Sequence, residues 1–166
     1  MSAPDPSPVR WREPASLVPL RWGGYRTRLY GGLWLIASGG VAIAGSNTFV
    51  LLLLLAGTIA HVAGWCILPS AGWRRVTVVL PATIAVWALL PGPRFLVMLV
   101  IPYLAWLLVR HRPWFAYPTV AFVLAAALVV GQLSSGYADM LWGLGVVVAV
   151  MVGSAWLAAV VSRGRT

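Results

Sequence analysis

Lysine and acidic residues are what this sequence lacks most clearly. It holds three Asp and Glu residues against twelve basic residues, and all twelve are arginine. Charged residues make up only 9% of the chain, whereas soluble domains carry roughly 25%. Hydrophobic residues make up 61% of the 166 positions, more apolar surface than a soluble fold of this length can bury. The shortage of charge therefore excludes an ordinary soluble domain and predicts an all-α integral membrane protein.

Residues that build disulfides, metal sites and acid-base centres are equally scarce. Cys66 is the only cysteine, so the chain can form neither an internal disulfide nor a zinc site based on cysteines. The acids are Asp5, Glu13 and Asp139, all in tails or linkers, so no carboxylate is available for acid-base chemistry at membrane depth. Walker, Rossmann and zincin motifs are absent. We therefore expect no metal, no cofactor and no catalytic activity.

The basic residues have a simpler explanation than nucleic-acid binding. A net charge of +9 would suit a nucleic-acid partner, but the arginines flank apolar segments, where the positive-inside rule places them. We therefore expect no nucleic-acid partner. The use of arginine alone is typical of a GC-rich bacterial genome, which points to the bacterial inner membrane as the location.

Apolar segments alternate with very short linkers along most of the chain. Six of them approach the roughly 20 residues that a membrane-crossing helix needs. They cover about 29–45, 48–68, 73–90, 95–109, 115–133 and 140–161. The sequence thus predicts a six-transmembrane-helix bundle with short loops, and only two residues separate the first two spans, which predicts a tight antiparallel hairpin.

The flanks of this membrane domain, 29–161, differ in composition from it. Residues 1–20 contain five prolines and predict a disordered cytoplasmic tail. Residues 21–28 mix arginine with aromatic rings, as expected in the headgroup region, and 162–166 form a short cytoplasmic tail. The first span has the basic leader of a signal peptide, but glycines dilute its apolar centre, and we expect it to be retained.

The distribution of arginines predicts the orientation. With both termini in the cytoplasm, eleven of the twelve arginines fall on the cytoplasmic side, and only Arg94 falls outside. Arg94 follows Pro91, Gly92 and Pro93, which interrupt an apolar run at 76–109 that would be about 51 Å long as one helix. The run can be two full spans joined by a periplasmic turn, or a hairpin that dips into the bilayer. The turn is favoured, because a charge at the tip of a dipping loop would cost several kcal/mol.

Three residues form a candidate ligand or proton site. Pro81 and Pro102 lie in the two spans beside the turn, and each frees a backbone carbonyl that needs another partner. His61 is the one titratable side chain well inside a span. These features predict, as an alternative function, a small transporter or channel. The simpler interpretation is that the prolines bend helices and that His61 is a neutral, hydrogen-bonded residue.

Small residues recur every fourth position in two of the spans. Such residues share one helix face and allow close approach of a neighbouring helix, within the bundle or between subunits. The two series are Ala56, Ala60 and Gly64, and Gly145, Ala149 and Gly153. We expect them to pack inside the bundle.

Aromatic and basic residues gather in the two linkers that face the cytoplasm. Tryptophan belts and arginines at this depth are typical of contact with anionic lipid headgroups or an acidic partner. The residues concerned are Trp73, Arg74, Arg75, Arg110, Arg112 and Trp114. Taken together, the sequence predicts a non-catalytic accessory or scaffolding subunit that binds lipid and either a membrane-protein partner or further copies of itself.

Overall fold

The computed structural model describes residues 14–17, 23–46, 49–134 and 136–163, and in these ranges all regular structure is helical. The predicted all-α class is therefore confirmed. Of the proline-rich tail, only the 3-10 turn η1 (Pro14–Leu17) belongs to the described residues; the rest of the tail, residues 21–22 and residues 164–166 lie outside them. The six α-helices are α1 (Tyr25–Ala44), α2 (Leu51–Ile67), α3 (Gly72–Trp87), α4 (Val100–Val109), α5 (Val120–Leu133) and α6 (Met140–Arg163).

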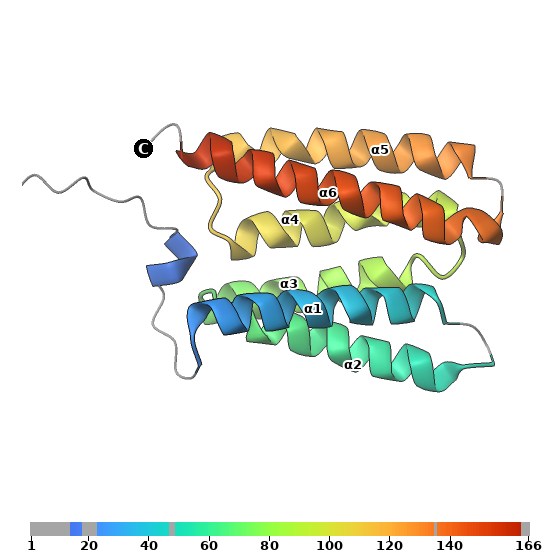
Figure 1. Cartoon of the computed structure of the whole chain (residues 1–166), viewed down its shortest axis with the longest axis horizontal. Helices are drawn as coiled ribbons and strands as arrows, with labels where there is room; N and C mark the ends of the chain where they lie inside the picture. Colours follow the sequence, from blue (N-terminus) through green and yellow to red (C-terminus); the bar gives the residue numbers. More distant parts are fainter. Residues whose placement is uncertain (1–13, 18–22, 47–48, 135, 164–166) are drawn as a thin grey trace, which may run out of the picture.

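The helices run roughly parallel to the long axis of the molecule in two groups of three (Figure 1). One group holds α1, α2 and α3, and the other holds α4, α5 and α6. The chain passes between the groups once, through the turn after α3. The start of α1, the end of α6 and the connection from α4 to α5 lie at the same end of the molecule, and we call this the basic end, because it carries Arg28, Arg74, Arg75, Arg110 and Arg112.

Two helical segments in the described ranges are long and apolar enough to cross a membrane by length and composition. They are Trp114–Leu133, which joins the 3-10 helix η3 (Trp114–Thr119) to α5, and Met140–Arg163, which is α6. Two further apolar helices, Leu51–Ile67 and Pro93–Val109, are shorter. Both have 17 residues, which for Leu51–Ile67, α-helical throughout, is about 26 Å.

The predicted span at 95–109 differs from a single α-helix. Its first part is a 3-10 helix, η2 (Pro93–Leu99), and α4 begins only at Val100. Pro102 lies in the first turn of α4, where its missing N–H costs little because first-turn donors have no partner within the helix. Since a 3-10 helix rises about 2.0 Å per residue, Pro93–Val109 extends about 29 Å. The 3-10 start thus lengthens a segment that would be short as an α-helix.

Glycine contacts join α1 to α2 as a tight antiparallel pair. Gly32 lies against Gly64, and Gly39 lies against Gly57, so that the two glycines on each helix are seven positions apart. A Cβ atom added at Gly39 would lie 2.5 Å from the backbone nitrogen of His61 and 2.6 Å from the carbonyl oxygen of Gly57. Only glycine allows backbones to approach this closely.

The small-residue series predicted on α2 is therefore displaced from the packed face. Gly64 is buried against α1 as expected, but Ala60 is half-buried and Ala56 is exposed. The packed face instead carries Gly57, His61 and Gly64, which are spaced by four and three residues.

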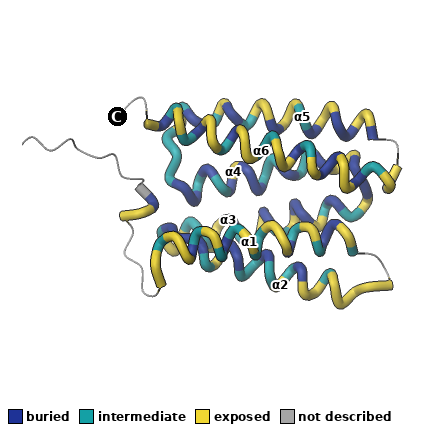
Figure 2. The backbone as a smooth tube through the Cα atoms, in the orientation of Figure 1, coloured by how far each residue is buried: buried dark blue, intermediate teal, exposed yellow. Residues whose placement is uncertain are grey.

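The series predicted on α6 lies on the outside of the bundle. Gly145, Ala149 and Gly153 are all exposed, and a Cβ atom added at either glycine would meet nothing within 4 Å. Exposed and buried stretches alternate along α6 (Figure 2). The inner face of α6 carries larger residues such as Leu144 and Val147. The expected packing of this series inside the bundle is thus not found among the described residues.

Replacing Gly39 with alanine should destabilise the protein, because the new methyl group meets backbone atoms of α2 that cannot rotate away. We expect Gly39→Ala to cost about 1–3 kcal/mol, the usual range for overpacking. Gly31→Ala is the matched control, because Gly31 lies on the same helix with nothing within 4 Å of an added Cβ, and alanine is the better helix former. The measurement is the thermal midpoint in mild detergent. Equal midpoints for the two variants would contradict the close contact.

Candidate functional site

His61 has a hydrogen-bond partner at each ring nitrogen. Trp65, one turn later on α2, places its Nε1 3.0 Å from Nε2 of His61, and Nδ1 of His61 lies 3.1 Å from the carbonyl oxygen of Ile36 on α1. An indole N–H can only donate, so Nε2 must accept, and Nδ1 must carry the hydrogen and donate to Ile36. This pattern selects one neutral tautomer of a side chain that is only 1% exposed.

The surroundings of His61 offer little for proton transfer or ligand binding. Asp139 is the only acid among the described residues, and it lies at the opposite end of the helices from the basic end. No group of three or more His, Cys, Asp or Glu side chains able to hold a metal ion occurs in the described part of the chain. His61 thus serves as a polar link between α1 and α2.

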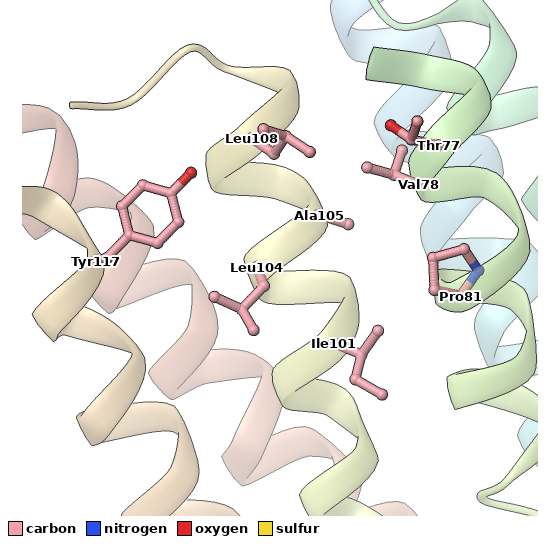
Figure 3. Close-up of a pocket in the computed structure, with 8 residues that line it drawn as sticks. All are labelled: Thr77, Val78, Pro81, Ile101, Leu104, Ala105, Leu108 and Tyr117. Carbon is pink, nitrogen blue, oxygen red and sulfur yellow. The ribbon is translucent and has the colours of Figure 1, made fainter. Parts of the chain in front are cut away.

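Pro81 lines an apolar groove between α3 and α4 (Figure 3). The groove has a volume of about 320 Å³ and opens to the outside of the bundle. Because Pro81 has no N–H, the carbonyl oxygen of Thr77, four residues earlier, loses its usual helical partner. The lining residues are Thr77, Val78, Pro81, Ile101, Leu104, Ala105, Leu108 and Tyr117.

The three residues of the predicted ligand site are therefore in different surroundings. Pro81 faces the groove, Pro102 is buried in the first turn of α4, and His61 packs against α1. Neither Pro102 nor His61 lines the groove.

Arginines at the basic end bind the last carbonyl groups of neighbouring helices. Arg28 Nε donates to the Ile67 carbonyl at 2.9 Å, and Arg75 donates to the Cys66 carbonyl at 2.7 Å, so both cap the C-terminus of α2. Arg74 donates to the Leu108 carbonyl of α4 at 2.8 Å. The final carbonyls of a helix have no partner within it and carry its negative dipole end. The arginines therefore stabilise helix ends.

Aromatic rings lie beside two of the arginines at the basic end. The guanidinium of Arg74 lies 5.1 Å from the centre of the Trp73 ring, and that of Arg110 lies 5.2 Å from the Trp106 ring. Arg110 also donates to the Tyr25 hydroxyl at the start of α1. Trp114 is 83% exposed at the same end. Tyr25 belongs to the 21–28 segment expected in the headgroup region, whereas Trp106 was not among the predicted interface residues, although its position one turn before Arg110 is visible in the sequence.

Helix α4 ends in a tight C-terminal cap with His111 at its centre. His111 has a φ of 54°, and the N–H groups of His111 and Arg112 bond to the carbonyls of Leu108 and Leu107. This is the Schellman pattern, in which glycine usually occupies the left-handed position. Burial lowers the pKa of His111, and the charges of Arg74 and Arg110 lower it further.

Comparisons with known proteins return no relative: no family model matches the chain, and neither does any curated protein or solved structure. The geometry of the described residues is therefore the basis for any function.

Replacing His61 with leucine should destabilise the protein by leaving the Trp65 N–H buried without an acceptor, which costs about 1–3 kcal/mol. Trp65→Phe removes the N–H group that would be left without an acceptor. The double variant should therefore lose less unfolding free energy than the sum of the losses of the two single variants, because the two groups share one hydrogen bond. The measurement is a double-mutant cycle of denaturant unfolding in detergent. Additive costs would contradict the Trp65–His61 hydrogen bond.

Acidification should destabilise the protein partly through His111. Its folded pKa is lowered, so the unfolded chain binds its proton more readily, and stability falls as the pH drops below the ordinary value of about 6.5. His111→Gln should therefore lose less stability than the natural chain between pH 7.5 and pH 5.5. The check is the thermal midpoint of both proteins at each pH. An equal loss in both would show that His111 is not responsible.

Proposed function

We propose that this chain is a six-span protein of the bacterial inner membrane with both termini in the cytoplasm, and that it works as a non-catalytic accessory or scaffolding subunit. The observation that carries the membrane location is the apolar outer surface. Large hydrophobic side chains at least 70% exposed occur on five of the α-helices, at Trp34, Leu52, Val76, Leu133, Leu141 and Trp156. Such a surface is costly in water and favourable in lipid.

The positions of charge support the orientation. Arg28, Arg74 and Arg110 gather at the basic end through their contacts with helix termini. Arg94 follows the Pro91–Pro93 turn at the other end, where the α1–α2 and α5–α6 connections also lie (Figure 1). α3 has 16 residues and carries the chain toward this end, which supports a periplasmic turn over a dipping loop. A basic cytoplasmic face agrees with the positive-inside rule.

Two features support an accessory role. Both ring nitrogens of His61 are occupied by structural partners, so the one buried imidazole has no free nitrogen for chemistry. On the outside, the small residues Gly145, Ala149 and Gly153 expose the backbone of α6, and small residues are what membrane helices use to approach one another. A helix of a partner protein or of another copy would pack here.

Transport has weaker support. The groove beside Pro81 is apolar and is lined by neither His61 nor Pro102, and so it suits hydrocarbon better than a hydrated solute.

Substitutions on the exposed face of α6 should release the partner without unfolding the protein. We expect Gly153→Leu to lose the partner or the oligomer that the natural chain retains, because leucine separates the backbones. Val152→Leu is the control, since Val152 is exposed beside Gly153 without being small. The measurement is the mass and composition of the complex purified in mild detergent from the native host, after alkaline washing shows that the chain stays in the membrane. A pure monomer of the natural chain would refute the accessory role.

A further inference from the structure

We propose that the groove between α3 and α4 binds one acyl chain of an anionic phospholipid, with Arg74 holding the phosphate at the groove's cytoplasmic mouth. The inference relies on the proposed membrane location and orientation, and it does not need the accessory role. It assigns the lipid class and the residues that would recognise it.

The shape and lining of the groove suit a hydrocarbon chain. Val78 and Pro81 form one wall, and Ile101, Ala105 and Leu108 form the other (Figure 3). From Ile101 to Leu108 the wall extends about 10 Å along the helix axis. The groove opens outward, so in a membrane its opening faces the lipid tails and one of them can enter from the side.

Arg74 does not line the groove but is bonded to Leu108, which does. It lies on α3 one turn before Thr77 and Val78, and its side chain crosses to α4, where it donates to the Leu108 carbonyl at 2.8 Å. The side chain is therefore fixed between the two helices that form the groove, with its guanidinium beside the Trp73 ring.

One N–H donor of the Arg74 guanidinium, at Nε, is buried and has no acceptor among the described residues. A buried N–H without an acceptor is costly, and arginine presents a fork of N–H groups that matches the oxygens of a phosphate. A lipid phosphate at the mouth would supply the missing acceptor.

Charge complementarity favours an anionic lipid over a zwitterionic one. Arg75 follows Arg74 in the chain, and Arg110 and Arg112 lie just beyond Leu108. The sole acid of the described residues, Asp139, precedes α6 at the far end. A free phosphate would satisfy the charge without filling the apolar groove, whereas a lipid does both.

The test uses the purified full chain in detergent, titrated with phosphatidylglycerol or with phosphatidylcholine of the same acyl chains. We expect phosphatidylglycerol to raise the thermal midpoint by about 5 °C more than phosphatidylcholine does. Arg74→Gln should lose at least half of that difference. Arg26→Gln, which removes the same charge from the exposed first turn of α1, should keep it.

A second pair of variants tests the groove itself. Thr77→Trp should block the groove and lower the number of phosphatidylglycerol molecules retained in native mass spectrometry, whereas Val76→Trp, on an exposed face of the same helix, should not. This readout counts bound lipid, and so it remains informative if Arg74→Gln weakens the fold.

Three results would overturn the inference: equal shifts with both lipids, equal losses in Arg74→Gln and Arg26→Gln, or the full shift with inorganic phosphate alone. Failure here is separable from failure of the accessory role. A chain that keeps its partner but shows no preference for phosphatidylglycerol refutes only the lipid site. A monomer that binds phosphatidylglycerol through Arg74 supports the lipid site and refutes only the accessory role.

Discussion

The close approach of α1 and α2 is the constraint on which much of this structure depends. Gly39 and Gly57 remove the side chains that would separate the two backbones, and Gly32 and Gly64 do so nearer the basic end. The hydrogen bond from His61 to the Ile36 carbonyl needs this approach, because it spans the two helices midway between the glycine pairs. A buried histidine that would be a liability in lipid thus becomes a second link between the same helices.

The last carbonyl groups of a helix need hydrogen-bond donors from outside that helix, and here arginine side chains provide them. Short loops leave few groups to bond the last carbonyls of α2, and at the end of α4 the Leu108 carbonyl accepts a second hydrogen bond besides the one from the His111 N–H. Arg28, Arg74 and Arg75 reach across from other helices to these carbonyls. The residues that predict orientation from the sequence are therefore also the caps that fix how the helices meet.

The helices and the central turn could be predicted because they depend on local composition. The packed face of each helix could not be predicted, because it depends on neighbouring helices that are distant in the sequence. A spacing of four selected Ala56, Ala60 and Gly64, whereas the packed face follows the seven-residue spacing shared by Gly57 and Gly64 with the glycines of α1. That shared spacing was present in the sequence, but its meaning requires knowing that the two helices are antiparallel. The outward position of Gly145 and Gly153 likewise depends on α5, η3 and η2, which pack against the buried residues of α6.

Pro81 and Pro102 show why residue type alone does not identify a site. Pro102 falls in the first turn of α4, preceded by a 3-10 helix that already departs from α-helical bonding, so its missing donor has little effect. Pro81 falls inside α3, where it removes the partner of the Thr77 carbonyl and faces the groove. The groove lies where the two groups of three helices meet, α3 on one side and α4 on the other. This junction has no glycine pairs like those of α1 and α2, and side chains of α3 and α4 line the groove between its helices. Tight packing at the glycines closes the space between α1 and α2, whereas a groove remains between α3 and α4. Arg74, which bonds the Leu108 carbonyl, places a positive charge near one end of that groove.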